Sequence, residues 1–400
     1  MKNRIVFLLC CMFIVIYITA CSKEENAVSE GSSIEDTVAE DIEATEAAIA
    51  DTSTEAGEPK KAEIAEKADI AEIAETAETA ETAETAETAE KEETKEGDHF
   101  IEETFTSKAL ASAKDGSSPT KRLKIYLPPS YYTSVKSYPV VYFFHGFGDT
   151  MNFNVARQFL FNQFMVEAGN KEFIVVEVDG SRANSSQGSF WVNSPVTGMW
   201  EDYVIKEIVP YIDETYRTIP KVESRGTAGY SMGGFASLNL ATRNPDVFSA
   251  VLSLCPGVLK EGSMKIAMDS WRGDNTFLTC YGQSFAPNEA KEEMCDIPAM
   301  DGTPVDNEII GKWETGFGDW REKLDAYLAK NQPLKAIHVI SGSSDYYKWI
   351  PEGCADLSEI MKEKGIDHVL TSLSIGHTFP TDYEKDYFVP FFSENLVFEE

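Results

Sequence analysis

The fold of this chain is decided by residues 226–234, which read GTAGYSMGG. Residues 226–230 are expected to form a short strand, and the residues after Ser231 continue as a helical run to about Arg243. Between them lies the pattern G-x-S-x-G, which in a strand–turn–helix context is typical of a nucleophile elbow. Side chains at positions 229 and 233 would collide with the strand and the helix, so a turn this tight requires glycine there. We therefore expect Ser231 in a strained backbone conformation at the end of a central strand.

Strands and helices alternate on both sides of this stretch. Residues 200–216 have the periodicity of an amphipathic helix. Alternation over some 300 residues predicts one α/β domain, with a mostly parallel, doubly wound sheet and helices on both faces. The expected strands are 121–127 as an edge strand, 140–144, 173–178, 226–230, 248–254, 336–340 and 369–375.

A serine in such a turn needs a base, and the chain has five histidines. His377 follows the last expected strand, so its loop should lie on the same edge of the sheet as Ser231. The chain order serine, acid, histidine also requires a histidine near the C-terminus. His99 lies at the start of the globular part, while His338 and His368 belong to strands, where histidines with satisfied hydrogen bonds are the simpler interpretation. His377 is the expected base.

The acid that orients the histidine should follow the preceding strand. Asp345 stands there, where a carboxylate would hold the imidazole in the required tautomer and stabilise its protonated form. Three other aspartates are weaker candidates. Asp319 opens an expected helix and is interpreted as its cap, Asp367 lies too early in its strand, and Asp382 lies beyond the histidine.

Residues 145–148, HGFG, end the strand at 140–144. In sites of this type, that loop supplies one backbone N–H of an oxyanion hole, and the residue after the serine supplies the other. The expected donors are the N–H groups of Phe147 and Met232, each typically worth about 3 kcal/mol of the barrier. A plain strand-ending turn is the alternative interpretation of His145 and Gly146.

Nine short stretches, taken in order, resemble the esterase family of α/β-hydrolases that includes feruloyl esterases, S-formylglutathione hydrolases and mycolyltransferases. The resemblance runs from about residue 123 to the C-terminus. It implies the α/β-hydrolase fold and a catalytic triad of Ser231, Asp345 and His377. The matching stretches are 142–146 YFFHG, 190–194 FWVNS, 200–203 WEDY, 208–212 IVPYI, 216–218 YRT, 229–234 GYSMGG, 244–248 NPDVF, 342–345 GSSD and 376–377 GH.

The chain departs from this family at two places. Residues 378–380, TFP, lack the tryptophan often found after this histidine in feruloyl esterases, and residues 257–320 are longer than the same region in compact relatives. This longer stretch is rich in aromatic residues, which is compatible with a lid, with an acyl-pocket wall or with ordinary loop packing. The candidate substrate contacts are His145, Trp191, Trp271 and Trp313.

The first 20 residues predict an export signal that is not part of the fold. Lys2 and Arg4 precede an apolar run at 5–18, which is too short for a membrane-spanning helix. Residues 18–21, ITAC, resemble the lipobox of bacterial lipoproteins, in which the chain is cut before a cysteine that is then lipidated. We therefore expect Cys21 to anchor an exported protein to the membrane at the bacterial cell surface; an ordinary secretory signal is the alternative.

Residues 21–98 predict an acidic, disordered linker before a domain at 99–400. Residues 22–98 contain 26 acidic and 6 basic side chains and no aromatic residue. Such a segment has too little apolar surface to offset its ordering entropy, and its charges repel. Residues 22–98 carry a charge of −20, and Lys2 and Arg4 add +2. Because the whole chain has a net charge of −32, residues 99–400 carry the remaining −14. This charge argues against nucleic acid as a partner.

The seven cysteines form no pattern of metal ligands. Cys10 and Cys11 belong to the signal. Four others remain in the domain, and export permits a disulfide between Cys280 and Cys295, the nearest pair in sequence. Free, partly buried thiols are the equal alternative. The four are Cys255, Cys280, Cys295 and Cys354.

Together these features predict an exported serine carboxylesterase that works through an acyl-enzyme and needs no metal or organic cofactor. The expected substrate is a small-molecule or polysaccharide-linked ester. Within the family that the chain resembles, export favours feruloyl or acetyl groups on plant polysaccharide over a cytoplasmic thioester. Two alternatives stay open: acyl transfer to a carbohydrate acceptor, and a surface binding protein whose catalysis has decayed. The intact set of Ser231, Asp345 and His377 argues against decay.

Overall fold

The computed structural model describes residues 97–149, 151 and 155–399. The expected signal, the lipidation site at Cys21 and almost all of the acidic linker lie outside the described residues. The described residues all belong to one compact unit, which spans Glu87–Glu400. Among them, no helix is both long enough and apolar enough to cross a membrane.

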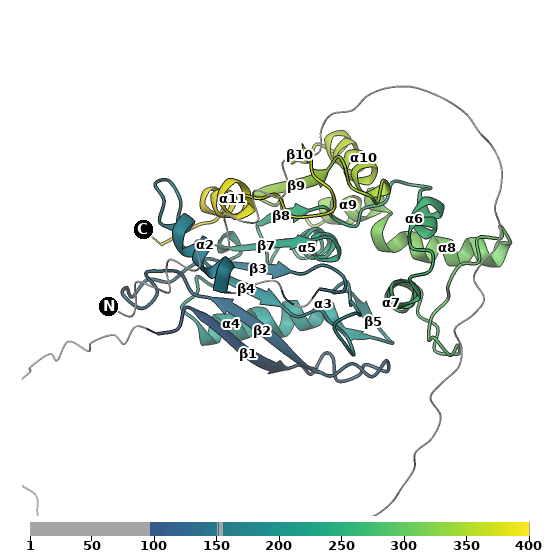
Figure 1. The fold of residues 1–400 in the computed structure, drawn as a ribbon, viewed down its shortest axis with the longest axis horizontal. Coiled ribbons are helices and arrows are strands. Elements are labelled where there is room, and N and C mark those ends of the chain that lie inside the picture. The colour runs from purple at the N-terminus through teal and green to yellow at the C-terminus, as the bar shows by residue number, and fades with distance from the viewer. Residues whose placement is uncertain (1–96, 150, 152–154, 400) are drawn as a thin grey trace, which may run out of the picture. The chain divides into compact units, whose positions relative to one another are not determined.

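An eight-stranded sheet forms the centre of this unit (Figure 1), with the strand order β1-β2-β4-β3-β7-β8-β9-β10. Strands β4 to β10 in this order pair in parallel, whereas β2 pairs antiparallel with both β1 and β4. This is the mostly parallel sheet of the α/β-hydrolase fold, as the sequence predicts. The strands are β1 Phe100–Thr106, β2 Thr120–Tyr126, β3 Val140–Phe144, β4 Ile174–Val178, β7 Arg225–Tyr230, β8 Ala250–Leu254, β9 Ala336–Gly342 and β10 Val369–Leu373, with a separate ribbon of β5 Asn193–Ser194 and β6 Gly198–Met199.

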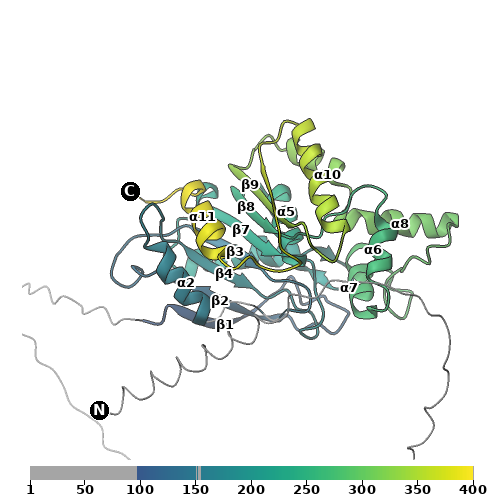
Figure 2. The same cartoon turned by 45° about the horizontal axis from the view of Figure 1, so that its top comes forward.

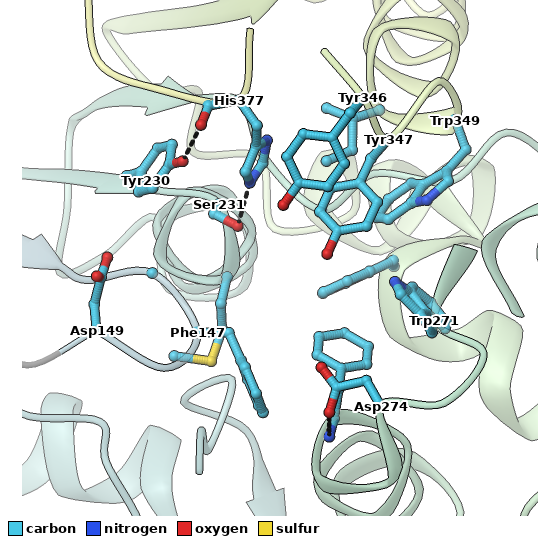
Figure 3. A pocket seen from close by; sticks show the side chains of 16 residues that line it. Phe147, Asp149, Tyr230, Ser231, Trp271, Asp274, Tyr346, Tyr347, Trp349 and His377 are labelled. Carbon is cyan, nitrogen blue, oxygen red and sulfur yellow. Dashed lines mark hydrogen bonds between the residues drawn. The ribbon is translucent and has the colours of Figure 1, made fainter. Parts of the chain in front are cut away.

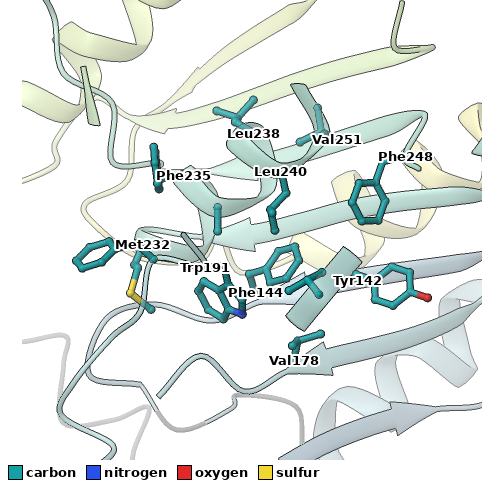
Figure 4. Packing of buried hydrophobic residues seen from close by; sticks show 14 of the residues in the cluster. Tyr142, Phe144, Val178, Trp191, Met232, Phe235, Leu238, Leu240, Phe248 and Val251 are labelled. Carbon is teal, nitrogen blue, oxygen red and sulfur yellow. The ribbon is translucent and has the colours of Figure 1, made fainter. Parts of the chain in front are cut away.

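The central strands β3, β4 and β8 are buried along their whole length because helices cover both faces of the sheet. In β3, Tyr142 and Phe144 point into one core cluster, as Figure 4 shows, whereas Val141 and Phe143 point into the other. The first cluster includes side chains of α3 Trp200–Asp202, η1 Tyr203–Ile208, α4 Val209–Thr215, α5 Met232–Arg243, α9 Trp320–Leu328 and α10 Trp349–Glu363. The second includes side chains of α2 Val155–Met165, η3 Glu384–Phe388 and α11 Val389–Asn395.

The long aromatic-rich stretch folds into helices rather than an irregular loop. It contains α6 Met264–Ser270, α7 Asn275–Phe285 and α8 Pro304–Phe317, which lie beside the ends of the central strands (Figures 1 and 2). Asp274 caps the start of α7 by accepting a hydrogen bond from the backbone N–H of Phe277 at 2.9 Å. The stretch therefore adds a wall of helices next to the edge where the elbow lies.

The structure corrects three expectations. Strand β2 is not at the edge of the sheet, because β1 pairs with its outer side. The sequence did not predict β1, because the polar residues of β1 hide the alternation that is typical of a strand. The expected helix at 200–216 contains a π-helical segment, η1, since Pro210 has no N–H to donate to the carbonyl four residues earlier. Asp319 precedes α9 as expected, but it has a left-handed backbone and makes no side-chain capping bond.

All four cysteines of the described domain are free and buried. Of the two interpretations that the sequence leaves open, the structure therefore has unpaired thiols at Cys280 and Cys295. Cys295 packs against the backbone of Gly282 in α7, where an added Cβ would lie 2.9 Å from its sulfur.

Candidate active site

Ser231 occupies the turn between β7 and α5 with φ 57° and ψ −114°, a region that costs a non-glycine residue free energy. Its N–H donates to the carbonyl of Leu254 at 2.9 Å. The neighbouring glycines allow the strand and the helix to approach closely. A Cβ at Gly229 would lie 2.1 Å from the carbonyl oxygen of Gly233, and a Cβ at Gly233 would lie 1.9 Å from that of Phe144. The turn thus has the geometry that the G-x-S-x-G pattern predicts.

The structure brings together the three residues that the sequence predicts as a triad. His377 Nε2 lies 2.8 Å from Ser231 Oγ (Figure 3), and His377 Nδ1 lies 2.7 Å from Asp345 Oδ2. Because a carboxylate accepts, Nδ1 carries the proton and Nε2 is left to accept the proton of the serine hydroxyl. Asp345 is fully buried, and its second oxygen accepts from the backbone N–H of Tyr347 at 2.9 Å. This arrangement can activate the hydroxyl as a nucleophile.

The loop that carries the histidine is tied to the elbow itself. The hydroxyl of Tyr230 donates to the carbonyl oxygen of His377 at 2.7 Å, and its ring lies 5.1 Å from the imidazole. Burial raises the pKa of Tyr230 above its ordinary value, which keeps this phenol a donor. Sequence reasoning did not single out Tyr230, although it is the variable residue before the serine in the motif.

Phe147 and Met232, the residues of the expected oxyanion donors, line the same cavity as Ser231. Met232 is the first residue of α5, so its N–H has no acceptor within the helix and sits at the positive end of the helix dipole. Phe147, in the loop after β3, lines the cavity with it. Two backbone N–H groups beside a nucleophile can stabilise the negative oxygen of a tetrahedral intermediate.

His145 lies behind this loop and not in the cavity. Its side chain is 1% exposed, and it is absent from the cavity lining. Its Nδ1–H donates to the carbonyl oxygen of Gly146 at 2.8 Å, while Nε2 accepts from the N–H of Gly180 at 2.9 Å. The expectation that His145 contacts substrate is therefore corrected: the residue holds the loop.

The cavity at Ser231 has a volume of about 290 Å³ and an aromatic wall (Figure 3). The helices of the long stretch contribute Trp271 and Phe277, and the segment after β9 contributes Tyr346 and Tyr347. Its charged side chains are acidic: Asp149 and Asp274 line it, and none of the described residues that line it is Lys or Arg. The remaining lining residues are Gly146, Phe147, Tyr230, Ser231, Met232, Gly257, Phe317, Trp349, Ile350 and His377.

A family model described as "Putative esterase" matches residues 119–368, more than half of the chain. The chain belongs to this esterase family. An esterase of Mycobacterium tuberculosis is 33% identical over 136 residues, which cover 33% of this chain and 28% of that protein. A protein of Xylanibacter ruminicola named endo-1,4-beta-xylanase/feruloyl esterase is 30% identical over 131 residues, which cover 31% of this chain and 18% of that protein. The match thus spans less than a third of each relative. Among solved structures, a ferulic acid esterase has a TM-score of 0.47 and 20% identity, covering 74% of this chain and 98% of that chain.

Two of the tryptophans that the sequence suggests as substrate contacts belong to the core. Trp191 is fully buried with its ring 5.0 Å from Phe144, and Trp313 is fully buried and donates to the carbonyl of Asp296 at 2.8 Å. Trp271 does line the cavity. The long stretch therefore serves both as cavity wall and as ordinary packing. The aromatic residues after Asp345 were not singled out from sequence, although their position next to the acid was a usable signal.

Cys255 completes a cluster of potential metal ligands with the triad. Its sulfur, a carboxylate oxygen of Asp345 and a ring nitrogen of His377 all lie within 4.8 Å of one another. Burial, followed by the nearby Asp345, raises the pKa of the Cys255 thiol to about 12, and the thiol rather than the thiolate is a poor metal ligand. The imidazole and the carboxylate are bonded to each other. Asp345 and His377 are therefore better explained as members of the hydrogen-bonded triad than as metal ligands, with Cys255 as a buried neighbour.

Proposed function

We propose that this protein is a serine carboxylesterase that works through an acyl-enzyme on Ser231. The observation that carries the proposal is the 2.8 Å contact between Ser231 Oγ and His377 Nε2, with Nδ1 bonded to a fully buried carboxylate. His377 takes the hydroxyl proton as Ser231 attacks the ester carbonyl. Asp345 stabilises the imidazolium that forms.

The negative oxygen of the tetrahedral intermediate is held by the N–H groups of Phe147 and Met232. The imidazolium of His377 then gives its proton to the leaving alcohol, and the acyl group stays on Ser231. Water attacks this ester with His377 again as base, and the acid leaves. Both steps use the same N–H donors and the same base, His377. Because these groups supply the proton transfer and the charge stabilisation, the proposed chemistry needs no metal or organic cofactor.

The substrate that we propose is an aromatic acyl ester, such as a feruloyl ester, of plant polysaccharide, with an acetyl ester as the smaller alternative. Supporting this are the aromatic wall of the cavity and its volume of about 290 Å³, at the small end for ligand sites. Asp149 and Asp274 disfavour anionic acyl groups by repulsion. The relative named endo-1,4-beta-xylanase/feruloyl esterase adds support.

Hydrolysis is favoured over acyl transfer because the mouth of the cavity is accessible to water. Tyr346, which lines it, is 66% exposed. Acyl transfer to a sugar would need an acceptor site that outcompetes water. Measuring the ratio of free acid to new ester when an alcohol is added separates the two reactions, and a majority of new ester would favour the transferase.

Ser231→Ala provides the direct test. We expect kcat/KM for nitrophenyl acetate to fall on the order of 10⁴-fold or more, because the nucleophile is lost and its partners cannot replace it. Methyl ferulate, acetylated xylan and short nitrophenyl esters, assayed together, then identify the acyl group. Equal rates for the variant and the parent protein would contradict the esterase proposal and favour a decayed binding protein.

We also propose that the protein is exported and lipid-anchored through Cys21. The support is the order of charged start, apolar run and ITAC at 18–21 in the sequence. An acidic linker between the anchor and the domain would then let the esterase reach substrates outside the cell.

A further inference from the structure

A second cavity of about 290 Å³ lies between α5 and the helices that pack beside it. It is separated from the catalytic cavity by aromatic side chains. Phe317 lines the catalytic cavity, whereas Phe235, on the first turn of α5 in Figure 4, and Phe285 line the second. The ring centroids of Phe235 and Phe317 are 5.0 Å apart, and those of Phe285 and Phe317 are 6.4 Å apart. The two cavities are therefore neighbours that are separated by these packed phenylalanine rings.

Asn239 is the unusual residue of this cavity. It lies one helical turn after Phe235 on the same face of α5 and is 5% exposed. Within the part of the chain that the structure describes, its side-chain amide has no hydrogen-bond partner, although it lines the cavity. The polar atoms of this amide are not among the described atoms that are buried without a partner, so the amide is open to the cavity, where a ligand or water can bond to it.

The charged side chains around Asn239 already have hydrogen-bond partners. Glu201 receives a hydrogen bond from Arg243 Nε at 3.0 Å. The Glu201 side chain is mostly buried, whereas the Arg243 side chain is largely exposed. Lys323 donates to the carbonyl oxygens of Thr315, at 2.7 Å, and Gly318. Burial lowers the pKa of Lys323 to about 8, so this side chain is still mostly charged at neutral pH but loses its charge at a lower pH than an exposed lysine does. The cavity thus combines paired charges, donors and aromatic surface.

We propose that this second cavity is a binding site for a neutral saccharide unit, with Asn239 as its central polar contact. An amide offers a donor and an acceptor side by side, which matches a hydroxyl group that both donates and accepts. Phe235 and Phe285 supply apolar surface for the C–H face of a sugar ring. A free anion is a poorer match, because Arg243 is already paired with Glu201 and the ammonium group of Lys323 already donates to two carbonyl oxygens. The volume suits one small ring rather than a long chain.

Asn239→Leu tests the role of the amide without removing volume. If Asn239 serves a ligand, leucine removes an unpaired polar group from a nearly buried position, and the melting temperature stays the same or rises. A lower melting temperature would mean that Asn239 has a structural role and would overturn the proposal. Asn307→Leu, the same exchange on the exposed surface of α8, is the matched control.

Binding is measured by calorimetry with the full-length protein carrying Ser231→Ala. The probes are xylotriose, cellotriose, maltotriose and arabinotriose, with inorganic phosphate as the anionic comparison. We expect at least one saccharide to bind, and Asn239→Leu to weaken that binding by about tenfold or more while Asn307→Leu leaves it unchanged. Binding of phosphate alone, no binding at all, or equal saccharide affinity in the Asn239→Leu variant would overturn the proposal.

This site goes beyond the proposed esterase function, and the calorimetric test does not depend on that function, because the protein used in it lacks the nucleophile. An inactive parent enzyme that still binds a saccharide would contradict the esterase proposal alone. Only one consequence rests on both proposals: Asn239→Leu should raise KM for a polysaccharide-linked ester. Absence of saccharide binding in an active esterase would contradict the second site alone.

Discussion

At the residue scale, several groups around the nucleophile act by holding other groups in position. Tyr230 bonds the carbonyl of His377, and the backbone of Tyr347 bonds Asp345. Neither contact involves a reacting atom. Both limit the movement of a triad member, and positions held to within a fraction of an ångström are what nucleophilic catalysis requires.

His145 offers the sharpest test of such a positioning role. The carbonyl of Gly146 and the N–H of Phe147 belong to one planar trans peptide, so they point in opposite directions. His145 Nδ1–H holds that carbonyl at 2.8 Å, which directs the N–H of Phe147 away from the imidazole. We expect His145→Leu to lower kcat by about 10- to 100-fold with little change in KM, and His145→Gln, which keeps a donor, to lower it less. Steady-state kinetics with a nitrophenyl ester measure both constants.

The same exchange at His338 is the control for this prediction. His338 bonds the hydroxyl of Thr371 at 2.9 Å between β9 and β10 and does not line the cavity. A rise in KM without a fall in kcat for His145→Leu would show that the residue serves substrate binding instead.

The buried cysteines provide a pH-dependent prediction at the same scale. Burial raises the pKa of Cys255 and Cys295 to about 12, so the folded protein keeps both thiols protonated at pH values where the unfolded chain, with a pKa near 9, ionises. The unfolded state then binds fewer protons, and this contribution lowers the free energy of unfolding as the pH rises from about 9 to about 12. At pH 8, we expect iodoacetamide to label neither thiol in the native protein and both in urea, as mapped by mass spectrometry. Rapid native labelling of Cys255 would contradict the buried, protonated state.

At the element scale, the site is made by one strand and one helix that approach each other more closely than side chains normally allow. The carbonyl groups of Phe144 and His145 leave no room for a Cβ at Gly233 in the first turn of α5. The long stretch at 257–320 acts at this scale as well, because its helices supply one wall of the catalytic cavity and part of the second cavity.

Gly233→Ala should therefore lower the free energy of unfolding by more than about 3 kcal/mol or prevent folding, because the contact of 1.9 Å involves backbone that cannot turn aside. Gly311→Ala in α8 is the matched exchange. A Cβ there meets nothing within 4 Å, so we expect a gain of about 0.5–1 kcal/mol from helix propensity. Chemical denaturation measures both changes, and similar effects at the two glycines would contradict the close approach at the elbow.

At the scale of the whole molecule, the site is assembled by the parallel sheet. Phe147 follows β3, Ser231 follows β7, Asp345 follows β9 and His377 follows β10. Carboxyl ends of parallel strands lie at one edge, so residues up to 230 positions apart in the chain meet there.

The anchoring proposal also belongs to this scale. We expect the wild-type protein to incorporate labelled palmitate and to sediment with membranes, and Cys21→Ser to lose both properties because the lipid has no attachment site. Cys10→Ser, a nearby exchange within the apolar run, should keep both. Equal labelling of the wild type and Cys21→Ser would contradict the lipobox interpretation.

Local patterns in the sequence were sufficient to predict the sheet core, the elbow and the three residues that the structure brings into hydrogen-bond contact beside it. Strand ends, turn glycines and apolar runs are properties of neighbouring residues, and in a parallel sheet the order of strand ends already indicates which loops meet. The sequence failed where an element has a weak pattern, as in β1, whose polar side chains hide its alternation. It also failed at η1, where a proline altered the hydrogen bonding of an otherwise regular helix.

Only the tertiary structure decided which aromatic residues face the catalytic cavity. Trp271 lines it, while Trp191 and Trp313 are core residues of the same chemical type. The same holds for His145, which packs behind the oxyanion loop, and for Asn239, whose unpaired amide marks a second cavity. The physical reason is that a side chain's type determines what it can contact, whereas the packing of segments distant in sequence determines what it does contact.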